Sequence, residues 1–432
     1  MEGVFLERDL RGANTSSLHW LGVLCGLAAG AWLGAAEAPV KLVTVGLSPY
    51  AISLCMVTGV FVARWTFPTL LKGTKYVFQD LNCRRHLIVW AVLAGALWAI
   101  ANTLTVFAIR DVGLAVAFPL WNANGLVGLI WGRVLFGELK GARRSIIMRV
   151  VMGAILITLA ATMLGFSAMH STSLGGSHAV RGVIAAFGAC LLWGTMYVPY
   201  RKAYLSGMNP LSFVTVFTVG ELATVAAAAI ALGGGYSSIM HELQQVRGLL
   251  FWLFLGGFVW VVGDLFQQFT AKYLGIGRGI SLANTNQLWG LAWAALVFGE
   301  LRGASWSQYT LVIGGSLGMI AGVTLIGSGA ASGKERTSQD EAILRECDRY
   351  DLDYLQTIRS MAGVEADDRK SERCWWDYLI MIVAVAFFVW FAASATVPPM
   401  NLNPVWIGIL GIASLALLAA GVFRLWRTTK FS

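Results

Sequence analysis

Charged residues are scarce in this sequence: they make up 13% of its 432 residues, whereas 57% are hydrophobic. Soluble domains carry about 25% charged residues, so the composition excludes a soluble fold. Histidine is rarer still, with five copies, and the six cysteines show no metal-ligand spacing. We therefore expect no metal site, no cofactor and no disulfide framework. With no intramembrane cluster of His, Cys or paired carboxylates, we expect no catalytic residues and no enzyme.

Long apolar blocks are what the sequence has instead. A helix needs about 20 apolar residues to cross a bilayer, and the alternating pattern of a membrane β-barrel is absent. The sequence thus predicts an all-α polytopic membrane protein. The first block is full spanning length, so we interpret it as a helix and not as a cleaved signal peptide. We assign twelve spans, to residues 20–40, 46–67, 87–109, 113–136, 147–167, 182–203, 210–232, 249–271, 276–298, 308–327, 377–396 and 404–425.

The basic residues between the spans predict the orientation. We assign Arg64, Lys72, Lys75, Arg84, Arg85, Lys140, Arg143, Arg144, Arg149, Arg201, Lys202, Lys272 and Arg278 to one set of loops. The alternate set holds only Lys41, Arg110, Arg181, Arg247 and Arg302. Since positive residues favour the cytoplasmic side, both termini are expected in the cytoplasm. We expect an integral protein of the cell (inner) membrane, and its net charge of +9 reflects this topology and not nucleic-acid binding.

The two halves of the sequence match each other. Residues 113–141 align without a gap on residues 275–303, and Phe136-Gly137-Glu138-Leu139 matches Phe298-Gly299-Glu300-Leu301. Each copy holds five predicted spans. Because five is odd, the second copy enters the membrane from the opposite side. Such an inverted repeat gives two near-equivalent arrangements that open to opposite sides, as alternating access in a carrier requires.

The repeat divides the chain into four parts. We predict a ten-helix core made of a first repeat, 1–167, and a second, inverted repeat, 181–328. A polar cytoplasmic linker, 329–375, leads to a two-helix appendage, 376–432. Apolar residues near helical spacing between Asp340 and Ile358 predict a short amphipathic helix in the linker. We favour a solvated connector there over a regulatory or partner-binding segment.

Polar residues inside predicted spans are the candidate site, because polar groups in hydrocarbon are costly. Trp98, Asn102 and Thr105 share one helix face, and Trp260, Asp264 and Gln267 occupy the equivalent face of the other half. An aromatic plate beside amides suits a sugar, although helix packing is the alternative. The predicted substrate-binding residues are Trp98, Asn102, Trp121, Asn122, Asn124, Trp260, Gln267, Asn284, Asn286 and Gln287.

The paired asparagines raise a geometric difficulty. Positions i and i+2 of a regular helix point about 200° apart, so Asn122 and Asn124 cannot both face one cavity. The same holds for Asn284 and Asn286. Either one asparagine of each pair bonds a neighbouring helix, or the helix is irregular there; only Pro119, before the first pair, signals irregularity.

Three carboxylates are candidates for coupling to a proton: Asp264, Glu221 and Glu37. A relay in the membrane needs such a group. The alternative is a carboxylate paired with a nearby cation.

Several of these residues resemble a known family. Gly95-Ala96-Leu97-Trp98-Ala99, Gly113, Pro119 and Phe136-Gly137-Glu138 look like the glucose/ribose porter branch of the drug/metabolite transporter superfamily, and Pro199-Tyr200-Arg201-Lys202 resembles its rhamnose symporters. The resemblance covers about residues 20–328 and implies a ten-helix carrier fold, often with cation-coupled uptake.

We therefore expect a secondary active transporter of a small polar solute in the bilayer, with a sugar as first choice and a proton or other cation as partner. A carrier of another metabolite or drug-like compound is the near alternative. A membrane-embedded sensor that uses the linker is the alternative from a different class. A homodimer is left open.

Overall fold

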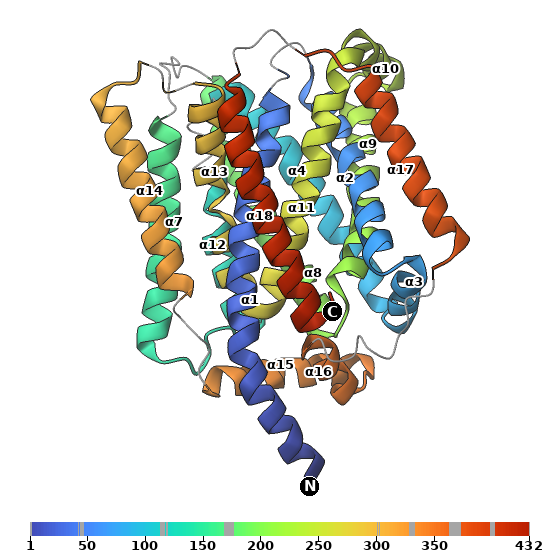
Figure 1. The fold of residues 1–432 in the computed structure, drawn as a ribbon, viewed down its shortest axis with the longest axis vertical. Coiled ribbons are helices and arrows are strands. Elements are labelled where there is room, and N and C mark those ends of the chain that lie inside the picture. Colours follow the sequence, from blue (N-terminus) through green and yellow to red (C-terminus); the bar gives the residue numbers. More distant parts are fainter. Residues whose placement is uncertain are drawn as a thin grey trace.

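The computed structural model describes residues 2–41, 43, 47–112, 117, 120–167, 177–299, 301, 303–327, 333–362, 373–397 and 402–431. In these ranges every regular element is a helix. The long helices lie side by side in one bundle, and short helices cover its two ends (Figure 1). Ten of the described helices are long and apolar enough to cross a membrane. The prediction of an all-helical membrane protein is confirmed.

The ten long helices coincide with ten of the twelve predicted spans. They are α1 (Glu2–Lys41), α2 (Pro49–Leu71), α4 (His86–Val112), α7 (Arg144–Ser167), α8 (Ser177–Leu205), α9 (Pro210–Leu232), α11 (Leu250–Leu274), α14 (Trp306–Gly327), α17 (Trp375–Ala393) and α18 (Pro404–Thr429). Two of them begin with the same device. Ser48 accepts a hydrogen bond from Ala51 N before Pro49, and Asn209 accepts one from Leu211 N before Pro210.

The remaining two predicted spans, 113–136 and 276–298, are broken, so the prediction of continuous helices there was wrong. In the first, a turn at Ala123 precedes α6 (Asn124–Leu135). In the second, α12 (Ile276–Ala283) and α13 (Asn286–Ala292) are separated by a turn at Asn284-Thr285, and the π-helix η2 (Trp293–Val297) follows. A broken helix is tolerated inside a membrane protein where it lines a cavity or is buried in protein.

Two short helices that the sequence analysis treated as loops follow equivalent helices of the two halves. They are α3 (Thr74–Cys83), after α2, and α10 (Tyr236–Gln245), after α9; the short η1 (Arg247–Leu249) then precedes α11. Each ten-residue helix starts after a glycine with positive φ, 80° at Gly73 and 91° at Gly235. This backbone conformation is accessible to glycine at little cost, which lets the chain turn sharply at the end of a long helix.

The helices of the two predicted repeats pack on each other reciprocally. Helix α11 contacts α1 and α2. In the same way, α4 contacts α8 and α9. Glycines make the contacts of α11 with α2 and of α4 with α9 close. A Cβ added at Gly95 of α4 would lie 2.0 Å from the carbonyl oxygen of Phe217, and one at Gly257 of α11 would lie 1.9 Å from that of Met56. Equivalent positions in the two halves thus carry equivalent contacts between helix backbones.

We expect Gly95→Ala to destabilise the protein by about 2 kcal/mol, because the added methyl group meets backbone atoms that no side-chain rotation can move. The measurement is the melting temperature of the purified protein in detergent. Gly411→Ala on α18 is the matched control, since open space surrounds Gly411. The control is expected to leave the melting temperature unchanged or raise it, because alanine favours a helix over glycine. An equal response of the two variants would contradict the close contact.

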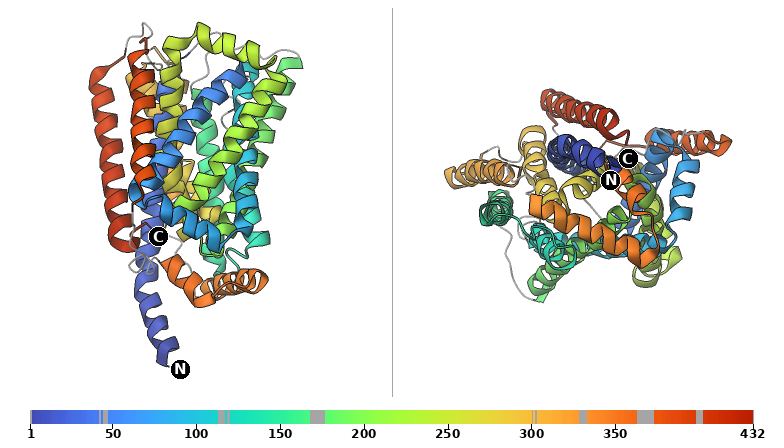
Figure 2. Two further views of the ribbon diagram at one scale, coloured as in Figure 1. Left: turned by 90° about the vertical axis from the view of Figure 1, so that its right-hand side faces the viewer. Right: turned by 90° about the horizontal axis from the view of Figure 1, so that it is seen from below.

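One end of the bundle is rich in cations, and we call it the basic end; it holds Lys72, Arg84, Arg201, Lys202 and Lys272. The helices α15 (Gly333–Tyr350) and α16 (Tyr354–Ala362) lie across this end, below the long helices in Figures 1 and 2. They replace the single helix predicted between Asp340 and Ile358. The chain turns between them at Asp351, whose φ is 51°.

The described part of the polar linker packs against the bundle. Lys202 Nζ lies 2.8 Å from the Glu346 carboxylate, and Lys272 Nζ donates to the Ser360 carbonyl at 3.2 Å. The rings of His86 and Tyr350 stack at 3.8 Å. These contacts join the linker to α4, α8 and α11, so this part is not simply a solvated connector.

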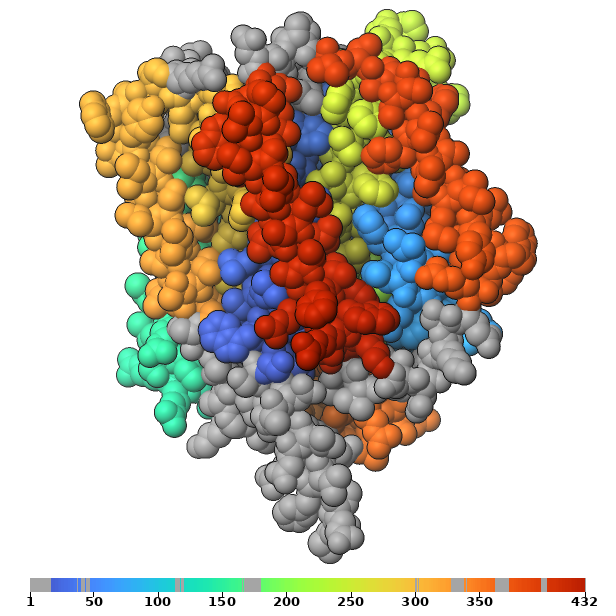
Figure 3. Space-filling view, viewed as in Figure 1, coloured from blue at the N-terminus to red at the C-terminus, as the bar shows by residue number. Residues whose placement is uncertain are grey.

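The two appended helices lie on the outside of the bundle. Helix α17 packs on α2, and α18 packs on α1. Figure 3 shows α18 crossing the front face of the molecule. Their outer surfaces carry large apolar side chains, among them Ile382 on α17 and Ile412 on α18, which are more than 60% exposed. Such surfaces suit a lipid environment.

Candidate functional site: a cavity between two broken helices

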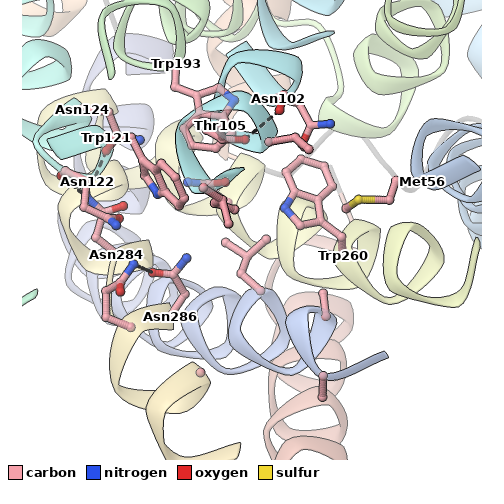
Figure 4. A pocket seen from close by; sticks show the side chains of 18 of the residues that line it. Met56, Asn102, Thr105, Trp121, Asn122, Asn124, Trp193, Trp260, Asn284 and Asn286 are labelled. Atoms are coloured by element: carbon pink, nitrogen blue, oxygen red, sulfur yellow. Dashed lines mark hydrogen bonds between the residues drawn. The ribbon is translucent and has the colours of Figure 1, made fainter. Parts of the chain in front are cut away.

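A cavity of about 450 Å³ lies between the broken helices. Its volume falls within the range of small-molecule sites. All ten predicted substrate-binding residues line it. Figure 4 shows Asn122, Asn124, Asn284 and Asn286 on one side of the cavity and Asn102, Thr105 and Trp260 on the other. The stripe on α4 therefore faces the same space as the asparagine pairs, and so do Trp260 and Gln267 of the stripe on α11; Asp264, its third member, does not line the cavity.

Tryptophans give the cavity both apolar faces and hydrogen-bond donors. Trp98 and Trp260 meet edge to face with their ring centroids 5.0 Å apart. The indole Nε1 atoms of Trp98, Trp193 and Trp293 are buried and have no hydrogen-bond partner among the described residues. All three rings line the cavity. An unpaired buried donor is costly, so these groups favour a ligand that brings acceptor oxygens.

The asparagine pairs face the cavity together because the helices break between or beside them. Asn284 Nδ2 donates to the carbonyl oxygen of Asn122 at 2.9 Å and to Oδ1 of Asn124 at 3.0 Å. The break of one half thus bonds to the break of the other. The structure has features of both alternatives: the helices are irregular, also at the second pair, where no proline signals it, and Asn284 bonds the neighbouring broken helix.

The cavity extends from the middle of the bundle toward the end opposite to the basic end. Its wall includes Ala38 near the end of α1, Val43, Ile109 near the end of α4, and Phe298 after η2. In the other direction, toward the basic end, the described residues of α12 and α8 are closely packed. Every residue of α12 is buried, and the side chains of Tyr200 and Tyr204 on α8 are fully buried.

Glu138 closes the basic end between the two broken helices. Its Oε1 accepts from Ile276 N at 2.9 Å, its Oε2 accepts from Gly277 N at 3.1 Å, and Arg201 Nε lies 3.3 Å from Oε1. The carboxylate thus joins the end of α6 to the start of α12, where the helix dipole favours a negative charge. We call this set, Glu138 with Arg201 and the first turn of α12, the basic-end latch.

Glycines make room for the latch. A Cβ at Gly132 would lie 2.5 Å from Glu138 Oε2, and a Cβ at Gly275 would lie 2.5 Å from Oε1. Gly275, whose φ is 86°, also provides the turn from α11 into α12. The glycine-rich segment Gly275–Gly279 therefore binds the protein's own carboxylate through its backbone N–H groups.

The predicted coupling residues Asp264 and Glu221 do not line the cavity; they are fully buried around Arg64. Arg64 Nη1 lies 3.1 Å from Glu221 Oε2, and Nη2 lies 2.7 Å from Asp264 Oδ2. Its guanidinium carbon lies 4.1 Å from the Phe217 ring centroid and 5.4 Å from that of Trp260. We call Arg64, Glu221 and Asp264 the buried charge triad. The side chain of Glu37, the third candidate, lies outside the described residues.

Sequence reasoning missed Arg64, which it assigned to a loop. Arg64 is fully buried inside α2, on the face toward α9 and α11. The two carboxylates in predicted spans could have indicated a buried arginine. They require a compensating cation, because an unpaired buried charge is very costly.

Comparison with known proteins gives one family match. Residues 45–167 match the model of a family described as sugar transport protein. This segment runs from just before α2 to the end of α7 and contains Trp98, Asn102, Asn122 and Asn124. The chain is similar to that family over this segment.

Individual relatives extend the similarity. The chain is 23% identical over 258 residues to a Listeria monocytogenes protein named for sugar uptake; the alignment covers 58% of this chain and 83% of that protein. It is 24% identical over 223 residues to the glucose uptake protein GlcU of Staphylococcus xylosus, covering 50% of this chain and 67% of GlcU. A solved protein structure superposes with a TM-score of 0.49 and 16% identity over 72% of this chain and 96% of the other.

Proposed function

We propose that this protein is a secondary active transporter that carries a sugar across the membrane by alternating access, coupled to a proton. The observation that carries the proposal is the cavity, in which tryptophan faces alternate with amide side chains between two broken helices. A sugar presents C–H faces that pack on aromatic rings and hydroxyl groups that pair with amides. The matches to sugar uptake proteins support the same solute class.

Alternating access needs two near-equivalent arrangements, and the reciprocal packing of the two halves supports it. Helix α1 contacts α11 as α8 contacts α4, and the inverted repeat accounts for both pairs. We propose that the structure represents a state whose cavity faces outward. With both termini in the cytoplasm of a cell (inner) membrane, the basic end is the cytoplasmic end, and the latch closes that end.

Counterflow in proteoliposomes tests the proposal. Vesicles loaded with unlabelled D-glucose should take up radiolabelled D-glucose transiently, because a carrier exchanges solute without a driving gradient. D-ribose and L-rhamnose extend the panel, and a nucleoside and an amino acid serve as other solute classes. Saturable counterflow of a sugar is the expected result. Counterflow of the nucleoside or amino acid alone would overturn the sugar assignment, and no counterflow with any solute would overturn the carrier.

The site within this proposal is tested by Trp98→Phe. The substitution removes an indole donor that has no hydrogen-bond partner in the described part of the chain, and it keeps an aromatic face. We therefore expect sugar affinity to fall about 5–10-fold, as for one hydrogen bond. The measurement is half-saturation in counterflow. Trp306→Phe is the matched control, since Trp306 on α14 is 87% exposed and does not line the cavity. Equal affinities for Trp98→Phe and the wild type would place the sugar elsewhere.

A further inference from the structure

The buried charge triad carries two acids and one base in a place without solvent. Arg64, Glu221 and Asp264 all have side-chain exposures of 0%. If both carboxyl groups were ionised, the triad would hold one uncompensated negative charge inside the bundle. Such a charge costs several kcal/mol or more, and buried groups avoid it by binding a proton or another cation.

The carboxyl groups of Asp264 and Glu221 accept different sets of hydrogen bonds. Asp264 accepts from Arg64 at 2.7 Å and from Gln268 Nε2 at 2.8 Å, and Gln268 accepts in turn from the Tyr204 hydroxyl. Glu221 accepts from Arg64 at 3.1 Å. Its other oxygen, Oε1, is buried, and the Glu221 carboxyl group has the Thr218 hydroxyl as its second neighbour. Asp264 thus accepts from a cation and an amide, whereas Glu221 has one cationic donor and a hydroxyl, which can accept as well as donate.

An acceptor for a proton on that oxygen is at hand. Thr218 is one turn before Glu221 on α9, and its buried hydroxyl lies beside the Glu221 carboxyl group. Residues three apart are neighbours on a helix surface. A hydroxyl both donates and accepts, so a protonated Oε1 can donate to Thr218, and the proton cancels the extra charge.

The surroundings of Glu221 offer few competing charges. Helix α2 contributes Arg64, and α11 contributes Asp264. On α8, Tyr200 packs its ring on Phe217 at 5.3 Å. Helix α4 meets this region through the backbone at Gly95, whose Cβ position lies 2.7 Å from Glu221 N. The Trp260 side chain lies between the buried charge triad and the cavity, because it lines the cavity and faces the Arg64 guanidinium.

We propose that Glu221 is the proton-binding group of this carrier and that Arg64 converts its protonation into motion of the two halves. The inference rests on the proposed function. With a proton on Glu221, Asp264 alone balances Arg64. When the proton leaves to the aqueous side, the Glu221 carboxylate is drawn to Arg64, which ties α2 of the first half to α9 of the second. Only the O–H bond of Glu221 forms and breaks.

Glu221→Gln tests this role because the amide imitates the protonated carboxyl group and cannot release a proton. Three measurements are made in the same proteoliposomes: D-glucose counterflow, D-glucose accumulation driven by a pH gradient, and the pH change on D-glucose addition in weak buffer. The wild type should show all three. Glu221→Gln should keep counterflow within about threefold and lose gradient-driven accumulation and the pH change by at least tenfold. Glu341→Gln, on the exposed surface of α15, should resemble the wild type.

The outcomes separate the two proposals. No counterflow in the wild type with any solute of the panel overturns the carrier itself. Counterflow in the wild type with undiminished proton movement in Glu221→Gln overturns the role of Glu221 alone. If Glu221→Gln does not fold, Thr218→Val provides the test, because it leaves every charge in place. It should reduce gradient-driven accumulation several-fold and leave counterflow unchanged; unchanged accumulation would overturn the inference.

Discussion

Arg64→Met should abolish the yield of folded protein. The substitution leaves Glu221 and Asp264 buried without their shared cation, and removing one partner of a buried ion pair costs about 3–5 kcal/mol. Here one arginine serves two carboxylates, with its charged nitrogens 3.1 Å and 2.7 Å from them. A loss of that size approaches the total stability of many proteins. The measurements are the monodisperse fraction in size-exclusion chromatography and the melting temperature.

A triple variant separates this electrostatic cause from lost packing. Arg64→Met with Glu221→Gln and Asp264→Asn removes all three charges and keeps similar side-chain volumes, so folding should return to near the wild-type level. Arg349→Met is the exposed control, since the Arg349 side chain is 65% exposed and its ion pair with Glu346 is long, 3.9 Å. If the triple variant unfolds as readily as Arg64→Met, the guanidinium acts mainly through its packing on Phe217 and Trp260.

The stability of Arg64→Lys should lie between that of Arg64→Met and that of the triple variant. Lysine keeps the positive charge, but its ammonium group is compact, whereas the planar guanidinium of arginine has several N–H groups in fixed directions. Lysine therefore cannot hold Glu221 and Asp264 in the same geometry. It also loses the flat contact with the Phe217 ring, 4.1 Å from the guanidinium. We expect folded protein with a melting temperature several degrees lower.

The predictable features of this chain are those that follow from composition and periodicity. Apolar length alone located α2 and α9, and the Ser-Pro and Asn-Pro pairs mark their starts. The spacing of Trp98 and Asn102 and its counterpart at Trp260 and Gln267 indicated faces that the structure brings to one cavity. These are local properties, which a sequence carries directly.

The features that escaped prediction depend on contacts between distant segments. The break at Asn284 is held by hydrogen bonds to Asn122 and Asn124, more than 150 residues earlier, and nothing beside Asn284 signals it. Arg64 lies near a predicted span end, and only its partners on α9 and α11 show that it is buried. Counting basic residues for topology treats every arginine as a loop residue, and that rule fails where an arginine neutralises buried acids.

The Gly275–Gly279 segment binds an anion, as its motif suggests, but the anion is a side chain of the protein and not a ligand. Its glycine spacing is similar to that of an anion-binding loop, but it follows a membrane helix and not a strand, which indicates a tight turn. The structure has both properties: Gly275 makes the turn, and the backbone N–H groups of Ile276 and Gly277 hold an anion, which is the Glu138 carboxylate. The partner could not be read locally, because it comes from the other half of the chain.

Under the proposed alternating access, Glu138→Ala should shift the protein toward the state that opens at the basic end. The substitution removes two charge-assisted hydrogen bonds to the start of α12 and the contact with Arg201. In an open state Glu138 would be hydrated, so only the closed state loses energy. We expect a loss of about 2 kcal/mol, which changes the ratio of the two states roughly thirtyfold.

Thiol labelling from each side of the membrane measures this shift. Ser281→Cys in a background without the native cysteines places a probe on α12, where Ser281 is 2% exposed in the closed arrangement. A membrane-impermeant maleimide should label it slowly in the otherwise unchanged protein. Adding Glu138→Ala should raise the labelling rate from the basic-end side, which the proposed orientation exposes in inside-out vesicles, and lower access from the opposite side.

Two comparisons identify the cause of any change in labelling. Glu138→Gln keeps one carbonyl acceptor but loses the charge, so its labelling rate should lie between those of the wild type and Glu138→Ala. Glu341→Ala, on the exposed face of α15, should leave the rate unchanged. Faster labelling from both sides would indicate general loosening of the bundle. An unchanged rate would mean that the contacts of α15 and α16, such as Lys202 with Glu346 at 2.8 Å, hold the basic end closed without the latch.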